Sequence, residues 1–267
     1  SLIQIDLIVV NMLFGDISAG EYAIALQWVI LLRAVAGVLS GVLTPTIFSY
    51  YTKKDAETLI RVTKSAVKLL GLAIALPVGL ICGLAPQILT VWVGEEFVFL
   101  APLMALLTVH LTVNLAVLPI FSINVAYNQV RVPGIVTLIM GIGNFGLAIA
   151  LSLLTGWGYY GVAVAGAIIL TMKNVFFTPW YVTRVLGVGS HIFTRSILPG
   201  AMATIIIWTV AAILGVVLPF DTLITLIVVG AVVALAYLAA VWKLGLNGLE
   251  RRLLESYLPS AFRRNIA

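Results

Sequence analysis

Long uncharged stretches are the feature that most constrains this chain. Six segments contain no Asp, Glu, Lys or Arg at all: 34–52, 69–94, 97–130, 132–172, 196–220 and 222–242. A helix needs about 20 mostly apolar residues to cross a bilayer. Only 9% of the residues are charged and 62% are hydrophobic, whereas about 25% of a soluble domain is charged. We therefore predict an all-α polytopic membrane protein and exclude a water-soluble globular domain.

Segment 132–172 is too long for one spanning helix, and the glycines at Gly156-Trp157-Gly158 divide it at a turn. With spans that carry one charge added, eight transmembrane helices are predicted: 2–14, 22–48, 66–92, 99–125, 133–155, 159–182, 196–218 and 221–242. The first is short, and no basic segment precedes it, so it is not a signal peptide. We interpret the start at Ser1 as a chain cut at or near the beginning of a helix.

Basic residues alternate between the predicted loops. The loops after the first, third, fifth and seventh helices have neither Lys nor Arg, and 13 of the 15 basic residues lie in the other loops and the tail: Lys53, Lys54, Arg61, Lys64, Lys68, Arg131, Arg184, Arg195, Lys243, Arg251, Arg252, Arg263 and Arg264. Basic loops stay cytoplasmic, so we predict a multi-pass protein of the cytoplasmic membrane with a cytoplasmic C-terminus. The tail 245–267 alternates leucines with charges, which favours an amphipathic helix on the anionic membrane surface over a frayed end.

Polar side chains in the span 99–125 fall on one helical stripe. At 100° per residue, Asn114, Phe121, Asn124 and Asn128 lie within 40° of His110. Such residues line a cavity or hydrogen-bond to neighbouring helices. We favour a cavity and select His110, Asn114 and Asn124 as substrate-binding candidates.

Two cations and one carboxylate lie inside the predicted spans. Arg33 is near the middle of its helix, on a face with Ser40 and Thr44, and serves either a binding site or a structural ion pair. Lys173 lines a cavity or extends to the membrane surface. Asp6 is a candidate for ion coupling or for a structural contact. The excess of positive charge favours an anionic headgroup as the substrate.

Motifs for other chemistry are missing. The sequence has no H-E-x-x-H, P-loop, G-x-S-x-G or C-x-x-C motif, and Cys82 is its one cysteine. We therefore expect no enzyme activity, no metal site, no cofactor and no nucleic-acid partner.

Four groups of residues resemble one family when taken in order. They are Gln4-Ile5-Asp6; Gly20-Glu21-Tyr22 with Leu43-Thr44-Pro45-Thr46-Ile47-Phe48; Gly94-Glu95-Glu96-Phe97 with Ala101-Pro102-Leu103; and Asn128-Gln129-Val130-Arg131 with Asn144 and Gly161-Val162-Ala163-Val164-Ala165. Together they resemble the C-terminal half of an O-antigen-type polysaccharide or oligosaccharide flippase of the multidrug/oligosaccharidyl-lipid/polysaccharide (MOP) superfamily.

The resemblance implies a six-helix lobe at 1–185, two further helices at 186–244 and the cytoplasmic tail at 245–267. It also implies that the chain is a fragment whose N-terminal lobe is missing, supplied by the same full-length chain or by a second copy. The implied function is flipping of a lipid-linked pyrophosphate oligosaccharide by alternating access, for polysaccharide export, in contact with membrane lipid. The alternatives are a small-molecule or drug cation antiporter of the same fold and a membrane scaffold without transport.

Overall fold

The computed structural model describes residues 2–189, 191–218 and 222–257, and these form helices joined by short turns. In chain order they are α1 (Leu2–Thr52), α2 (Ala56–Gly83), α3 (Ala85–Trp92), η1 (Glu95–Leu100), α4 (Ala101–Val109), α5 (Leu111–Ala116), α6 (Leu118–Ala126), α7 (Arg131–Leu154), α8 (Tyr159–Thr171), η2 (Met172–Phe177), α9 (Thr178–Leu186), α10 (Thr194–Val217), α11 (Leu223–Ala240), η3 (Val241–Gly245) and α12 (Gly248–Tyr257). Within this part of the chain, seven segments are long and apolar enough to span a membrane. The prediction of an all-α polytopic membrane protein is confirmed.

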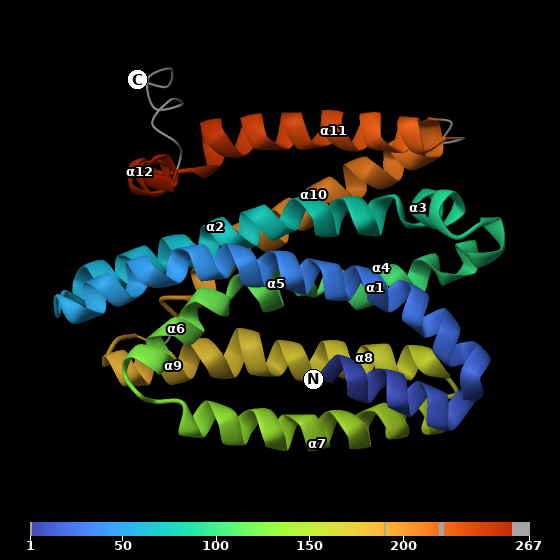
Figure 1. Ribbon diagram of the computed structural model, residues 1–267, viewed down its shortest axis with the longest axis horizontal. Helices are drawn as coiled ribbons and strands as arrows, with labels where there is room; N and C mark the ends of the chain where they lie inside the picture. The colour runs from blue at the N-terminus through green and yellow to red at the C-terminus, as the bar shows by residue number, and fades with distance from the viewer. Residues whose placement is uncertain (1, 190, 219–221, 258–267) are drawn as a thin grey trace.

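The sequence predicts eight spans, and the structure has seven within the described residues. The difference arises because the first two predicted helices form one element, α1. Residues 16–21, predicted as a loop, are helical, and only Gly15 leaves helical geometry inside α1, with φ 80° and ψ 179°. Glycine adopts a positive φ without steric cost. Figure 1 shows the result: α1 starts near the middle of the bundle, reaches one end, bends, and returns along the whole length.

Two predicted straight spans are interrupted. The segment 95–126 consists of η1, α4, α5 and α6, and 159–186 consists of α8, the π-helical turn η2 and α9. Proline stands in the first turn of α4, α6 and α9, where its missing N–H removes a hydrogen bond to the preceding helix. The register of side chains therefore changes along both spans.

The most extensive helix packing joins α2 to α10. A Cβ atom added at Gly200 would lie 2.8 Å from the backbone carbon of Gly71, and one at Gly83 would lie 2.5 Å from the Ala211 Cβ. Thr112 of α5 and Thr204 of α10 join their hydroxyls at 2.8 Å. Small residues allow such approach between helices in a membrane. This contact joins α10 to the predicted six-helix lobe, while a domain boundary at 185 stays a prediction.

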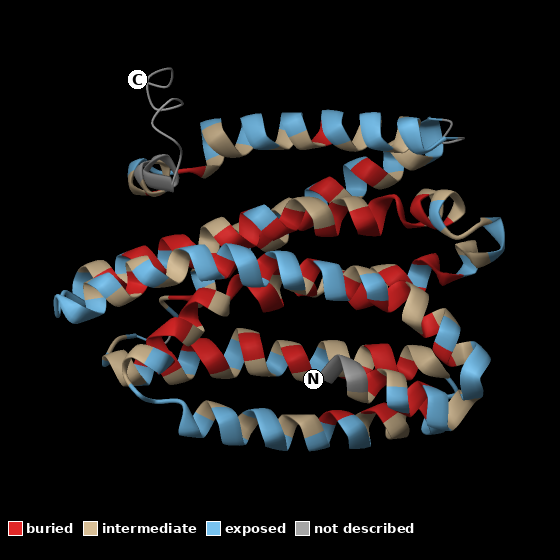
Figure 2. Cartoon of the chain, in the orientation of Figure 1, coloured by how far each residue is buried: buried red, intermediate tan, exposed pale blue. Residues whose placement is uncertain are grey.

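Burial separates central from peripheral helices. Figure 2 shows buried residues concentrated on α2 and on the short helices α4 to α6, whereas α7 and α11 at the two edges are mostly exposed. Only Asn144, Ala148 and Ser152 are buried in α7, and only Val233 is buried in α11. Exposed faces composed of apolar side chains are what helices in contact with lipid present.

The bundle has two ends of different charge. The α1–α2, α6–α7 and α9–α10 connections and α12 lie at one end, on the left in Figure 1, which we call the basic end. Basic residues at this end include Lys53 and Lys54 between α1 and α2, Arg131 and Arg195 in the first turns of α7 and α10, and Lys243 in η3 before α12. The structure thus brings the predicted basic loops together. Which side of the membrane this end faces stays a prediction.

The helix α12 lies within the predicted tail 245–267, of which residues 258–267 lie outside the described residues; the amphipathic character of this tail stays a prediction. Its first turn is capped reciprocally. The backbone N–H of Asn247 donates to Glu250 Oε2 (2.8 Å), and the backbone N–H of Glu250 donates to Asn247 Oδ1 (2.9 Å). The Lys68 ammonium of α2 also donates to Glu250 Oε2, at 2.8 Å. Glu250 is therefore both the cap of α12 and its link to α2.

We expect Glu250→Ala to detach α12 from α2. The change removes a buried partner of Lys68 and a helix cap, at a cost of about 2 kcal/mol or more. Limited proteolysis in membranes should cleave α12 several-fold faster than in the wild type. The matched control is Glu57→Ala, whose exposed pair with Arg61 contributes at most about 0.5 kcal/mol. Equal cleavage of the two variants would contradict the role of Glu250.

Candidate functional site

Three of the predicted site residues line one small cavity inside the bundle. Asp6 comes from the first part of α1, Arg33 from its long part, and His110 from the junction of α4 and α5. The opposite wall is α8, with Ala163, Gly166, Ala167 and Leu170. The cavity volume is about 20 Å³, which is room for one water molecule. The bend at Gly15 is what places Asp6 beside the returning part of the same helix.

Asp6 is held by a partner that the sequence analysis did not assign to the site. The Asn144 amide of α7 donates to Asp6 Oδ1 at 2.8 Å, and both residues are buried. A Cβ atom at Gly166 would lie 3.2 Å from Asp6 Oδ2, so the glycine leaves room for the carboxylate. A signal was available in the sequence: Asn144 is the longest polar side chain on one helical face of α7, which otherwise holds the small residues Gly134, Thr137, Gly141, Ala148 and Ser152.

Arg33 makes no ion pair within 4 Å in the part of the chain that the structure describes. Its Nε is buried without a hydrogen-bond partner. Asp6, His110 and Lys173 are the charged or titratable groups within its electrostatic reach. Placing a guanidinium inside a membrane is costly unless it is compensated. The structure therefore does not support a tight structural ion pair for Arg33, and it leaves this cation available to a bound group or to water.

A hydrogen-bonded chain connects the cavity to α8 and η2. The Asn114 amide lies 3.1 Å from His110 Nδ1 and donates to the Thr171 hydroxyl at 3.0 Å. The side-chain amide of Asn174 donates to the backbone carbonyl of Asn114 at 3.2 Å. His110 and Asn114 thus lie together as predicted, and their neighbours on α8 and η2 hold them in place.

Lys173 lies in the π-helical turn η2, a feature that often marks functional sites. Its ammonium lies over the Phe121 ring, 5.5 Å from the ring centroid, and the residue is half-buried. A cation over an aromatic face is attracted by the ring quadrupole. Lys173 therefore lies against the predicted polar stripe on α6, with Arg33 within electrostatic reach.

Asn124 is buried, 3% exposed, and neither of its amide atoms has a partner among the described residues. It is not hydrogen-bonded to the His110–Asn114 chain. The helix is interrupted at His110 and again at Val117, so a stripe that Asn124 shares with His110 and Asn114 stays a prediction. Asn128 also lies outside the helix, with φ 54° in the turn that ends α6.

Comparisons with known proteins add one relative. The chain is 39% identical over 252 residues to the uncharacterized membrane protein EpsK of Bacillus subtilis (strain 168). The match covers 94% of this chain and 50% of EpsK, so the chain spans about half the length of this curated relative. No family model matches the chain, and no solved structure matches it. The chain is thus a polytopic membrane protein that is similar to one half of another membrane protein.

Proposed function

We propose that this chain is part of a transporter that flips a lipid-linked pyrophosphate oligosaccharide across the cytoplasmic membrane by alternating access. The observation that carries the proposal is the placement of two cations inside the bundle: Arg33 lacks an ion pair in the described structure and shares a cavity with Asp6 and His110, and Lys173 lies nearby. Among the described residues, Asp6 is the one carboxylate that lines this cavity, and a pyrophosphate headgroup would supply the second negative charge that balances Arg33 and Lys173 together. Arginine and lysine inside a membrane usually mark a substrate or ion pathway.

An exposed face on the long part of α1 supports the proposal that the intact transporter encloses a larger cavity. Gln27, Ala34, Gly37 and Gly41 are exposed, and Figure 2 shows this face of α1 uncovered. The cavity of about 20 Å³ is too small for a sugar. In the proposal, a second lobe covers this face and encloses the substrate between the two lobes. That lobe belongs to the same full-length chain or to a second copy, and EpsK is about twice as long as the matched segment.

The proposed orientation follows the charges of the two ends. The basic end faces the cytoplasm because Lys and Arg are enriched in cytoplasmic loops. The C-terminus then lies on the cytoplasmic side, with α12 along the anionic membrane surface.

We expect Arg33→Ala in the full native chain to reduce translocation at least tenfold. The test reconstitutes the purified protein into vesicles with a fluorescent polyprenyl-pyrophosphate oligosaccharide and measures how fast the sugar becomes accessible to an external glycosidase. Arg33→Lys should retain part of the activity, because it keeps the charge and loses the planar guanidinium. The matched control, Lys243→Gln at an exposed position of the basic end, should transport normally. Wild-type rates for Arg33→Ala at equal folded yield would reject the assignment.

A cation antiporter is the second candidate, and Asp6 is the observation that favours it. Its buried carboxylate lies in the same cavity as Arg33. In this case Asp6→Asn would abolish uptake of a cationic dye into energised vesicles. Neither the wild type nor Arg33→Ala would move the lipid-linked sugar above background.

A further inference from the structure

A second cavity lies at the basic end, away from the site described above. Its volume is about 370 Å³, within the usual range of about 300–1,000 Å³ for small-molecule sites. It opens where the α1–α2 turn meets the end of α6, and it is lined by Tyr50, Tyr51, Thr52, Lys54, Asp55, Ala56, Leu59 and Tyr127. We call it the tyrosine cavity. Because the candidate spans end at Thr52 and begin again at Ala56, it lies at the membrane–water boundary.

Two helix ends of the same type build this cavity. In α1 the Lys54 amide donates to the Tyr51 carbonyl (3.0 Å) and the Asp55 amide to the Tyr50 carbonyl (3.2 Å). Lys54 has φ 57° at the position of this cap that usually holds glycine, and Asn128 has φ 54° at the corresponding position after α6. Lysine rarely adopts this conformation. Residues held in a strained backbone conformation cluster at functional sites, so the side chain of Lys54 is a candidate for a binding role.

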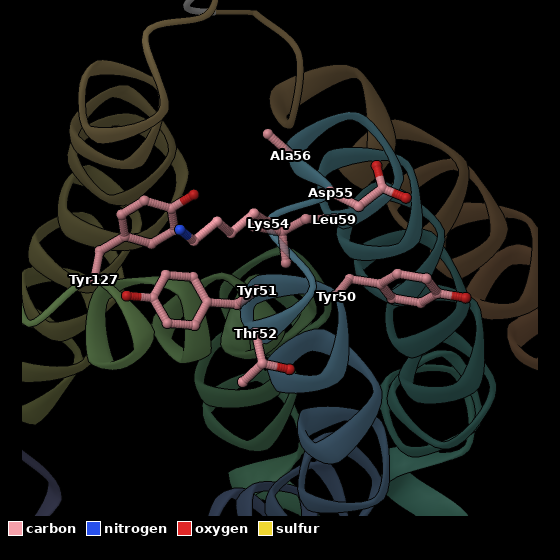
Figure 3. Close-up of a pocket in the computed structure, with 8 residues that line it drawn as sticks. All are labelled: Tyr50, Tyr51, Thr52, Lys54, Asp55, Ala56, Leu59 and Tyr127. Atoms are coloured by element: carbon pink, nitrogen blue, oxygen red, sulfur yellow. The ribbon is translucent and has the colours of Figure 1, made fainter.

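The side chains of the cavity suit an anion with several oxygen atoms. Figure 3 shows the Lys54 ammonium beside the Tyr127 ring, with Tyr51 next to them. The Tyr51 and Tyr127 rings pack with centroids 4.8 Å apart, which positions both phenols. Within the described chain, neither hydroxyl has a hydrogen-bond partner, and the Lys54 ammonium forms no ion pair. One ammonium and two phenol hydroxyls without such partners therefore belong to residues that line one cavity.

The acidic residue of the cavity does not neutralise Lys54. The Asp55 carboxylate accepts a hydrogen bond from the Thr58 amide at 3.0 Å and caps α2. The backbone hydrogen bond from Thr58 holds the pKa of Asp55 below its usual value. Figure 3 shows this carboxylate directed away from the Lys54 ammonium. Lys53, the neighbouring cation, lies over the Tyr50 ring instead.

We propose that the tyrosine cavity binds a phosphate-bearing lipid headgroup. The Lys54 ammonium pairs with the phosphate, and the Tyr51 and Tyr127 hydroxyls donate to its oxygen atoms. Two sources share this chemistry: an anionic phospholipid of the bilayer, and the pyrophosphate of a polyprenyl-linked sugar. The proposal does not rest on the transport function, because a phospholipid satisfies the same contacts.

The test is calorimetric binding to the full native chain in dodecyl maltoside micelles, which carry no phosphate. Three probes are titrated separately: dioctanoyl phosphatidylglycerol, a short-chain polyprenyl pyrophosphate and inorganic phosphate. We expect Lys54→Gly to weaken binding at least fivefold. Glycine prefers the positive φ at this position, so the turn stays intact and misfolding does not explain the loss. Tyr127→Leu should also weaken binding, and the matched control Lys53→Gln should bind within twofold of the wild type.

The three probes identify the source. Tighter binding of phosphatidylglycerol supports a bilayer phospholipid, and tighter binding of the polyprenyl pyrophosphate supports the sugar carrier. Binding of inorganic phosphate with the same dependence on Lys54 supports recognition of the phosphate alone. The proposal is overturned if Lys54→Gly binds all three probes as tightly as the wild type, or if Lys53→Gln weakens binding as much as Lys54→Gly. A protein that binds the probes but does not flip sugar-lipid would contradict the transport proposal and leave this one standing.

Discussion

Replacing Gly83 by alanine should sharply reduce the amount of folded protein. The added Cβ would lie 2.5 Å from the Ala211 Cβ, 2.7 Å from the Trp208 carbonyl oxygen and 2.9 Å from the Ala212 amide nitrogen. Two of these atoms are backbone of α10, so no side-chain rotation relieves the clash. Overpacking of this kind costs about 1–3 kcal/mol or more. Because α2 and α10 form the most extensive helix contact in the bundle, we expect the upper part of that range.

The matched control is Gly230→Ala on α11. No heavy atom lies within 4 Å of a Cβ at this position, and alanine in a helix interior is more favourable than glycine by about 1 kcal/mol. The same chemical change should therefore destabilise at Gly83 and be neutral or stabilising at Gly230. Size-exclusion profiles of detergent extracts and thermal unfolding midpoints would measure both. Equal behaviour of the two variants would show that α2 and α10 do not approach as described.

Asp6→Asn and Arg33→Gln should each destabilise the protein, and the double variant should cost less than the sum of the two. Asp6 and Arg33 line the same cavity. Removing one of two opposite charges inside a membrane leaves the other without compensation, which costs about 3 kcal/mol in buried sites. The double variant removes both charges, so we expect a coupling energy of about 1 kcal/mol or more.

The measurement is unfolding in mixed micelles of increasing sodium dodecyl sulfate content, for the wild type and the three variants. Asn144→Leu is the companion variant, since it removes the hydrogen-bond donor of Asp6 (2.8 Å) and leaves both charges in place. Additive single effects, within about 0.5 kcal/mol, would mean that the two charges act independently. Such a result would remove Asp6 as the compensating charge of Arg33 but would not exclude a substrate role for Arg33.

The spanning segments followed from local composition because a bilayer imposes a local rule. Each backbone amide in the apolar layer must find its partner within its own helix, so an uncharged stretch such as 196–220 already predicts α10. The distribution of basic residues likewise predicted which connections share one end. His110 and Asn114 were also found by spacing, because they lie only four residues apart and any nearly helical backbone keeps them adjacent.

The interrupted helices were harder to predict. Gly15 and Pro119 are local signals for a break in a helix, whereas the π-helical turn η2 has no such signal. How far a break turns the chain depends on the helices that pack around it. The spacing argument for Asn124 assumed one continuous helix, whereas the structure interrupts the helix at His110 and Val117, so the placement of Asn124 beside His110 stays a prediction. The contact between Asp6 and Asn144 was missed because the residues are far apart in the sequence and come from α1 and α7.

The sequence by itself determined the class of protein, the positions of the last six spans and the excess of cations in the interior, since these depend on composition and on hydrogen bonds within single helices. Only the tertiary structure decided that Asp6, Arg33 and His110 share one cavity, that Asn144 holds Asp6, and that the ends of α1 and α6 form the tyrosine cavity. These arrangements depend on how helices distant in sequence bend and pack. Such packing follows from shape and small residues at each contact, which no single segment encodes.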